Sequence, residues 1–113
     1  MGYRLEISKK VYTGFSGGKL YGYIEEEKLK KCKSFRWLVE RGYLEEEDVD
    51  TFDYGASHAT VLTAEEFKEF IELYKEDFKN NYGYNPEWFY EQYYSKEFQE
   101  LIESNKDKII EWW

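Results

Sequence analysis

Carboxylates and aromatic rings are the side chains of this sequence whose types and spacing best suit a binding role. Glutamates recur every three or four positions between residues 63 and 80, and at 100° per residue they fall within an arc of about 60°. These glutamates are Glu65, Glu69, Glu72 and Glu76. A stripe of this kind attracts basic groups on a partner. An ordinary amphipathic helix has the same pattern on its solvated face, so both interpretations remain open.

A row of carboxylates can also imitate the phosphates of a nucleic acid, and charge density tests that idea. The stripe carries one charge every ~5 Å, whereas duplex DNA carries one every ~1.7 Å along its axis. Lys68, Lys75 and Lys79 flank the stripe and can each pair with a glutamate three residues earlier. The pattern favours an acidic face that docks on a basic patch over strict imitation of phosphates.

Residues 81–94 hold seven aromatic side chains in fourteen positions, with no lysine or arginine. Surfaces that stack nucleic-acid bases combine rings with a positive groove, so this segment does not suit that role. We expect Phe89 and Tyr93 to be core residues and some of the other rings to be exposed, as at binding hot spots. The rings expected to contact a partner are Tyr84, Trp88, Tyr90 and Tyr94. Rings and carboxylates together can also hold a small aromatic or cationic ligand.

Catalytic and metal-binding sets are hard to assemble from this sequence. Cys32 and His58 are the only cysteine and histidine, and no pattern brings them together or completes a zinc site. Residues 48–55 depart from the spacing of a calcium loop, and Ala59 stands where its bidentate glutamate belongs. We therefore expect no catalytic residues, cofactor or metal. The alternative is a ligand pocket or small active site near His58.

Composition narrows the class of partner. The 113 residues suit one domain, residues 1–113, with a net charge of −8. Residues 63–113 contribute −7 of this charge, which opposes direct binding to nucleic acid or anionic lipid. The single cysteine, and the lack of a long apolar run or a targeting motif, predict a cytoplasmic protein with no membrane segment.

Two β-hairpins are expected to frame the site. Residues 3–7 alternate apolar and polar side chains, and residues 20–24 return after a glycine-rich turn, which predicts the first hairpin. Residues 51–54 and 59–62 are two further β-prone runs on either side of a short turn, which predicts the second.

Helical segments are expected to carry the stripe and the rings. Residues 25–40 have helical spacing, although Ser34 could cap a shorter second helix that Gly42 closes. Thr63 and Glu66 form a capping box that starts the helix of the stripe.

The C-terminal part predicts two more helices after Gly83 stops the striped one. Asn85 and Pro86 start the first of them, and Ser95 starts the last. The apolar side of this last helix is expected to hold Phe98, Leu101, Ile102, Ile109, Trp112 and Trp113. A second acidic stripe is then expected at Glu100, Glu103, Asp107 and Glu111. The fold class is α+β: two hairpins forming a small antiparallel sheet, a helix between them, then about three amphipathic helices.

A short, acidic, tyrosine-rich chain with one cysteine and no catalytic set resembles the small accessory proteins of phages and prophages, including anti-CRISPR and other anti-defence inhibitors. The resemblance implies a non-enzymatic inhibitor in the bacterial host cytoplasm. It would use an acidic, aromatic surface to block the basic nucleic-acid site of a defence effector. A self-assembling structural protein, homodimeric or larger, remains a further alternative, because surplus rings also suit a contact between copies.

Overall fold

The structure is a computed structural model that describes residues 2–9, 20–45 and 58–112. These residues form four strands and five helical segments. The strands are β1 (Gly2–Lys9), β2 (Leu20–Glu25), β3 (His58–Leu62) and β4 (Lys108–Trp112). The helices are the 3-10 helix η1 (Glu26–Lys31) and α1 (Lys33–Glu40), α3 (Ala64–Lys79), α4 (Pro86–Tyr93) and α5 (Lys96–Glu103). The predicted mixture of helices and antiparallel strands is confirmed.

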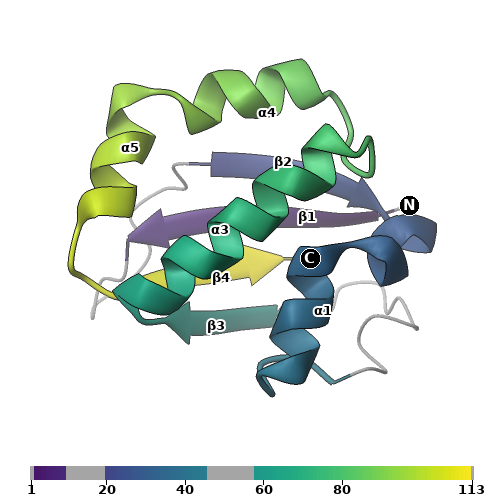
Figure 1. Ribbon diagram of the computed structural model, residues 1–113, viewed down its shortest axis with the longest axis horizontal. Coiled ribbons are helices and arrows are strands. Elements are labelled where there is room, and N and C mark those ends of the chain that lie inside the picture. The colour runs from purple at the N-terminus through teal and green to yellow at the C-terminus, as the bar shows by residue number, and fades with distance from the viewer. Residues whose placement is uncertain (1, 10–19, 46–57, 113) are drawn as a thin grey trace.

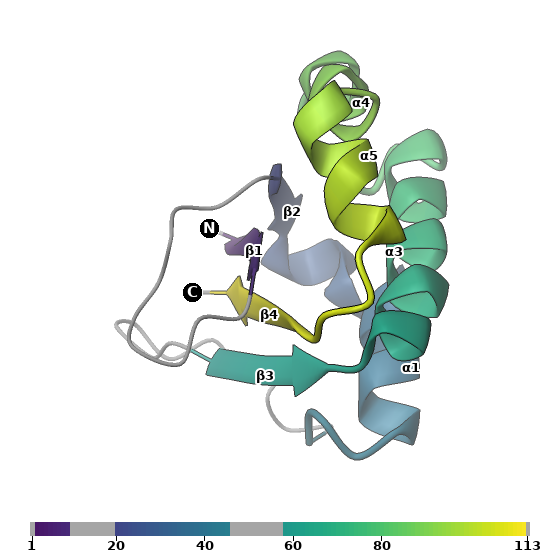
Figure 2. The same ribbon diagram turned by 90° about the vertical axis from the view of Figure 1, so that its left-hand side faces the viewer.

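The strands form one antiparallel sheet in the order β2-β1-β4-β3, and the helices cover one of its faces (Figures 1 and 2). The first predicted hairpin is confirmed, since β1 and β2 pair with Ile7 opposite Leu20. Residues 59–62 lie in a strand as expected, but this strand pairs with β4. The other half of the second predicted hairpin, residues 51–54, lies outside the described residues.

The prediction of one long last helix is wrong. Helix α5 ends at Glu103, and residues 108–112 form β4, which lies between β1 and β3. Ile110 is buried there, opposite Ile7 on one neighbouring strand and Thr60 on the other. A segment with partners on both sides satisfies its backbone donors and acceptors through two ladders, which outweighs a helical pattern in the sequence.

The helical segment after β2 breaks at Cys32 into η1 and α1. The expected cap, Ser34, lies inside α1, whereas the N-cap residue Cys32 makes no side-chain capping bond. The cap comes from α3: Asp77 accepts hydrogen bonds from the backbone N–H groups of Lys33 at 2.9 Å and Ser34 at 3.1 Å. Gly42 closes α1 in the left-handed region, with φ of 80°.

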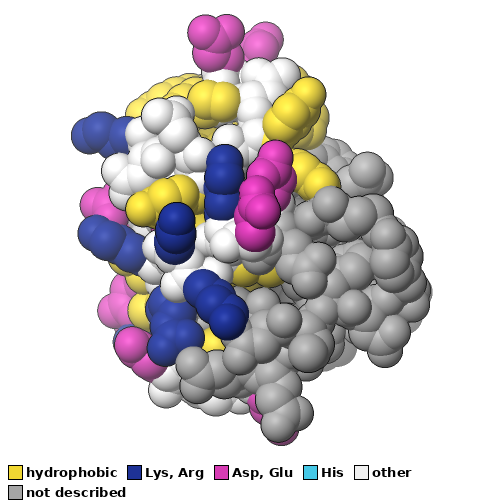
Figure 3. Space-filling view, turned by 90° about the vertical axis from the view of Figure 1, so that its right-hand side faces the viewer, with side chains coloured by type: hydrophobic (Ala, Val, Ile, Leu, Met, Phe, Trp, Pro, Cys, Tyr) yellow, Lys and Arg dark blue, Asp and Glu magenta, His cyan; other side chains and the backbone are white. Residues whose placement is uncertain are grey.

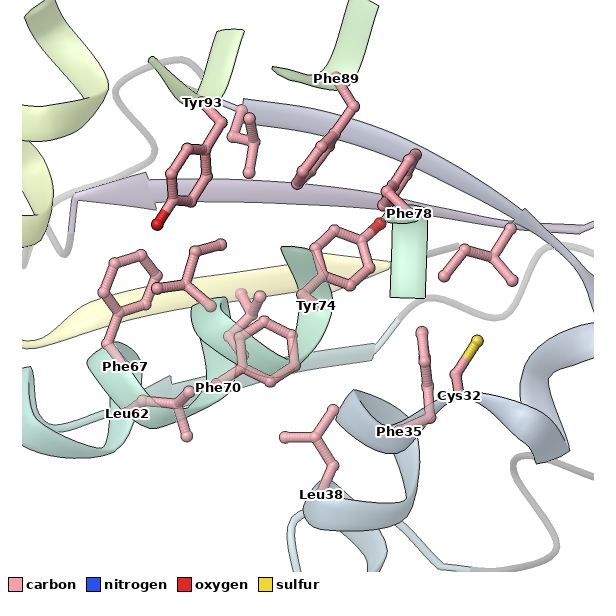
Figure 4. Close-up of a cluster of buried hydrophobic side chains, with 14 of the residues drawn as sticks. Cys32, Phe35, Leu38, Leu62, Phe67, Phe70, Tyr74, Phe78, Phe89 and Tyr93 are labelled. Atoms are coloured by element: carbon pink, nitrogen blue, oxygen red, sulfur yellow. The ribbon is translucent and has the colours of Figure 1, made fainter. Parts of the chain in front are cut away.

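Helix α3 lies diagonally across the sheet and supplies much of the core (Figure 1). Its capping box is confirmed, because Glu66 N–H donates to the Thr63 hydroxyl and Thr63 N–H donates to the Glu66 carboxylate. Figure 4 shows rings of α3 meeting rings of α4 above and apolar side chains of α1 beside them. The buried aromatic residues of α1, α3, α4 and α5 are Phe35, Phe67, Phe70, Tyr74, Phe78, Phe89, Tyr93 and Phe98.

The connection from α3 to α4 is fixed by a glycine pressed against a ring. Helix α3 ends at Lys79, ahead of the predicted stop, and Asn81 takes a φ of 65°. A Cβ atom on Gly83 would lie 2.3 Å from the Phe78 ring, so only glycine fits there. The next N–H, that of Tyr84, donates to a carbonyl of β2 at 2.7 Å. The predicted start of α4 is confirmed, with Asn85 as cap and proline in the first turn.

Candidate functional site

Helices α3 and α4 border a surface hollow of about 590 Å³. Its lining includes residues of both predicted partner-binding groups, the glutamate stripe and the rings of residues 81–94. Its lining residues are Glu72, Lys75, Glu76, Lys79, Tyr90 and Tyr94, and we call it the α3–α4 hollow. Glu72 and Glu76 come from the predicted acidic stripe, and the two tyrosines come from the aromatic segment. The fold thus places carboxylates one turn apart on α3 beside rings one turn apart on α4.

Each side of the α3–α4 hollow is held by contacts between the two helices. The Tyr93 hydroxyl, beside the hollow, donates to Glu72 Oε1 at 2.9 Å, and the Tyr90 hydroxyl donates to the Lys75 carbonyl at 3.2 Å. The Tyr90 and Tyr94 rings lie nearly parallel, at 21°, with centroids 6.4 Å apart. Burial raises the pKa of Tyr93, and the bond to Glu72 raises it further, so this hydroxyl stays a donor at neutral pH.

A lysine already occupies part of this site. Lys75 Nζ lies 3.2 Å from Glu72 Oε2 and 4.9 Å from the centroid of the Tyr93 ring. Partial burial lowers the pKa of Lys75, but the hydrogen bond to Glu72 and the nearby Tyr93 hydroxyl outweigh it, so the pKa is raised overall. The ammonium group therefore keeps its charge, and the predicted pairing of Lys75 with the glutamate three residues earlier is confirmed.

The rings of residues 81–94 divide between core and surface as expected. Phe89 and Tyr93 are buried, whereas Tyr84 and Tyr94 are each 65% exposed and Trp88 is 43% exposed. Tyr90 is half-buried. Tyr94 lines the hollow, but Tyr84 and Trp88 lie outside its lining; Tyr84 packs edge-on against Tyr23 of β2 at 5.9 Å. Of the three exposed rings, Tyr94 alone belongs to the described lining of the hollow.

Basic residues from other segments pair with glutamates of the α3 stripe, which the sequence pattern does not indicate. Glu69 pairs with Arg41 at 2.8 Å, and Glu76 pairs with Lys33 at 3.3 Å. Glu65 is exposed.

Lysines also gather at the end of η1, which carries Lys28, Lys30 and Lys31 in its last turn. Figure 3 shows the side of the molecule where lysine and arginine side chains cluster in the described region, below hydrophobic side chains. Acidic residues alone therefore do not distinguish the hollow; the neighbouring rings do.

The second predicted acidic stripe is not formed, which corrects the prediction. Glu100 and Glu103 are exposed on α5, but Asp107 lies in the following loop, half-buried. Glu111 belongs to β4, and its side chain is outside the description. These four residues span a helix, a loop and a strand, so they do not share one helix face.

The two residues considered for nucleophilic chemistry lie in different environments. Cys32 is buried, and its thiol contacts the Lys28 carbonyl at 3.4 Å. Burial and the nearby Asp77 raise the pKa of the Cys32 thiol well above its ordinary value, so it stays protonated and unreactive. His58 lies in β3 opposite Trp112, and its side chain is outside the description.

Across residues 2–9, 20–45 and 58–112, no three His, Cys, Asp or Glu side chains are grouped so as to hold a metal ion. No helix in that part of the chain has both the length and the apolar character to cross a membrane.

Sequence reasoning missed Asp77, which has a structural role beside the site. At 100° per residue it lies about 120° from Glu65, at the edge of the apolar arc, and a carboxylate at that position was the available signal. Its carboxylate is buried and also accepts a hydrogen bond from the Ser34 hydroxyl. Burial raises the pKa of Asp77, although the hydrogen bonds from Ser34 and Lys33 pull it down.

The chain matches no family model, and no curated protein or solved structure matches it.

Proposed function

We propose that this chain is a non-enzymatic protein-binding module that docks a basic segment of a partner protein on the α3–α4 hollow. One observation carries the proposal: Glu72 and Glu76 on α3 and Tyr90 and Tyr94 on α4 line the same hollow. Carboxylates supply charge complementarity to a basic segment, and exposed tyrosine supplies contact area at low entropic cost. Hollows of this size are typical of binding sites.

The class of partner that we propose is a nucleic-acid-binding protein, and the role is that of a phage-type inhibitor of a host defence effector in the bacterial cytoplasm. The charge of −7 in residues 63–113 supports this choice, because it repels phosphates and attracts the basic surfaces that bind them. A chain docked on such a surface would exclude nucleic acid from it. The inhibition is stoichiometric and involves no chemical step.

The test is affinity capture from bacterial lysate at low and high salt, followed by a nucleic-acid binding assay on the captured protein. The site variant is Glu72→Gln/Glu76→Gln. The matched control is Glu100→Gln/Glu103→Gln on α5, which removes the same two charges at exposed positions outside the lining of the hollow. A Tyr94→Ala variant tests the ring contribution.

We expect wild type and the α5 control to retain a nucleic-acid-binding protein at low salt and to release it at high salt. We also expect this protein to lose nucleic-acid binding when the chain is added. Equal loss of capture in both glutamine variants would mean that net charge alone attracts the partner, and would reject the hollow as the docking site.

Self-association is the second candidate, and the exposed rings favour it. Tyr84, Trp88 and Tyr94 are large and exposed on and around α4, and such rings suit an interface between copies. Sedimentation velocity across a wide concentration range tests this candidate. A dimer that Trp88→Ala dissociates would support it, whereas a monomer at every concentration would dismiss it.

A further inference from the structure

The α3–α4 hollow combines three kinds of groups that recognise a cationic side chain. The carboxylates of Glu72 and Glu76 supply charge, and the nearly parallel rings of Tyr90 and Tyr94 supply π surface. Tyr94 has the more exposed ring. The Tyr93 hydroxyl holds one oxygen of Glu72 in position at 2.9 Å. These groups attract a cation through charge, hydrogen bonding and cation–π contact, in competition with Lys75 and Lys79, which line the same hollow.

Lys75 shows which chemistry this surface accepts. Its ammonium group is 3.2 Å from Glu72 and 4.9 Å from the Tyr93 ring centroid, so it makes the two kinds of contact, with a carboxylate and with a tyrosine ring, that an incoming cation would make. Lys75 is the internal competitor for this part of the hollow. Glu76 is held by Lys33 at 3.3 Å, but both side chains are about half exposed or more, at 49% and 62%. An ion pair exposed to that degree is weak and can be displaced.

We propose that the hollow takes an arginine side chain from a segment of the partner protein, and that Lys75 limits its affinity by occupying Glu72. This inference rests on the proposed docking function and names the group that is docked. The reason for arginine is its planar guanidinium, which can bond a carboxylate through two N–H groups while lying flat on a tyrosine ring. A lysine guest would offer only the contacts that Lys75 already makes.

The test uses fluorescence anisotropy with three labelled peptides that share one glycine–serine sequence and carry arginine, lysine or citrulline at the same positions. Citrulline keeps the planar shape and removes the charge. The protein variants are Lys75→Met, Lys68→Met and Glu72→Gln/Glu76→Gln. Lys68→Met is the matched control, because it removes one positive charge from an exposed position of α3 outside the hollow.

The arginine peptide is expected to bind wild type at least about fivefold more tightly than the lysine peptide, and the citrulline peptide more weakly than either. Lys75→Met is expected to tighten binding of the arginine peptide by about threefold to fivefold more than Lys68→Met does. The glutamine variant is expected to weaken it by at least about tenfold.

Four results would overturn the inference. Equal affinity for the arginine and lysine peptides, with both weakened in the glutamine variant, removes arginine selectivity but leaves the docking surface in place. If Lys75→Met and Lys68→Met change the affinity for the arginine peptide equally, Lys75 does not compete with the arginine. If neither peptide binds, the inference and the proposed docking function both fail. Free arginine amide that binds as tightly as the peptide would assign the hollow to small cations and also overturn the inference.

Discussion

The two sides of helix α3 use the same types of residue for different purposes. On the buried side, Asp77 caps α1 and Phe78 packs against Phe89 of α4, and the Asp77 carboxylate is held by a hydroxyl and two backbone N–H groups. On the exposed side, which borders the α3–α4 hollow, Glu72 and Glu76 pair with lysine side chains. A carboxylate fixed by buried donors stabilises the fold, whereas an exposed carboxylate paired with a lysine side chain is available to a partner.

The largest expected effect is on the buried side, at Phe78. Its ring lies parallel to that of Phe89, with centroids 3.9 Å apart, and it also contacts Tyr74. Phe78→Ala should lower the free energy of unfolding by about 3–5 kcal/mol, because it removes a buried ring and leaves a cavity. Urea denaturation followed by tryptophan fluorescence measures this, with Phe78→Leu as the milder control. A loss below about 1 kcal/mol would contradict the buried position of this ring.

The next effect is expected at Asp77. Asp77→Ala should cost about 2–4 kcal/mol, since it leaves the N–H groups of Lys33 and Ser34 without their acceptor at the start of α1. Ser34→Ala, which removes only the hydroxyl donor, should cost less. Hydrogen exchange should show faster exchange at Lys33 and Ser34 in the Asp77 variant. Unchanged exchange at these two amides would argue against a cap supplied by α3.

A smaller, pH-dependent effect is expected where α3 meets the end of the α1 segment. The Tyr43 hydroxyl donates to Glu66 Oε2 at 2.5 Å. This bond lowers the pKa of Glu66 from its ordinary 4.5 and raises the pKa of Tyr43 from its ordinary 10.0. Tyr43→Phe should therefore cost about 1 kcal/mol near neutral pH.

The sign of each shift fixes where this cost disappears. Glu66 stabilises the fold fully above pH 4.5, and its contribution is lost as the pH falls through its lowered folded-state pKa. Tyr43 contributes fully below pH 10.0 and loses that contribution as the pH rises through its raised pKa. Urea midpoints of wild type and Tyr43→Phe should therefore converge in acid and in strong base. A difference that stays constant across this range would disprove the hydrogen bond.

The smallest effects on stability are expected on the exposed side of α3, around the α3–α4 hollow. Glu76→Gln and Tyr94→Ala should each change the free energy of unfolding by no more than about 0.5 kcal/mol, because both side chains are exposed. The same variants should weaken partner binding, so thermal melting and binding assays on one set of samples separate the two roles. A loss of stability above about 2 kcal/mol in either variant would erase the difference between the two sides of α3.

Features that depend on neighbouring residues were predictable from the sequence. The capping box of Thr63 and Glu66, the Asn85 cap and the burial of Phe89 and Tyr93 were all predicted and are confirmed. The exposure of Trp88 and Tyr94 followed from the surplus of rings over one helix face. These features arise from hydrogen bonds across three residues and from helical periodicity, both of which a sequence carries directly.

Three features were decided only by the tertiary structure, because they depend on contacts between residues far apart in the sequence: strand β4, the Asp77 cap and the α3–α4 hollow. Residues 108–112 became a strand because β1 and β3 offer backbone partners on both sides, which a helical pattern does not reveal. Asp77 caps a helix that begins 44 residues earlier. The sequence by itself determined which residues are acidic and aromatic, and where α3 and α4 begin. The packing of α3 against α4 decided which of them share a hollow, because two helix faces meet only once the core is buried.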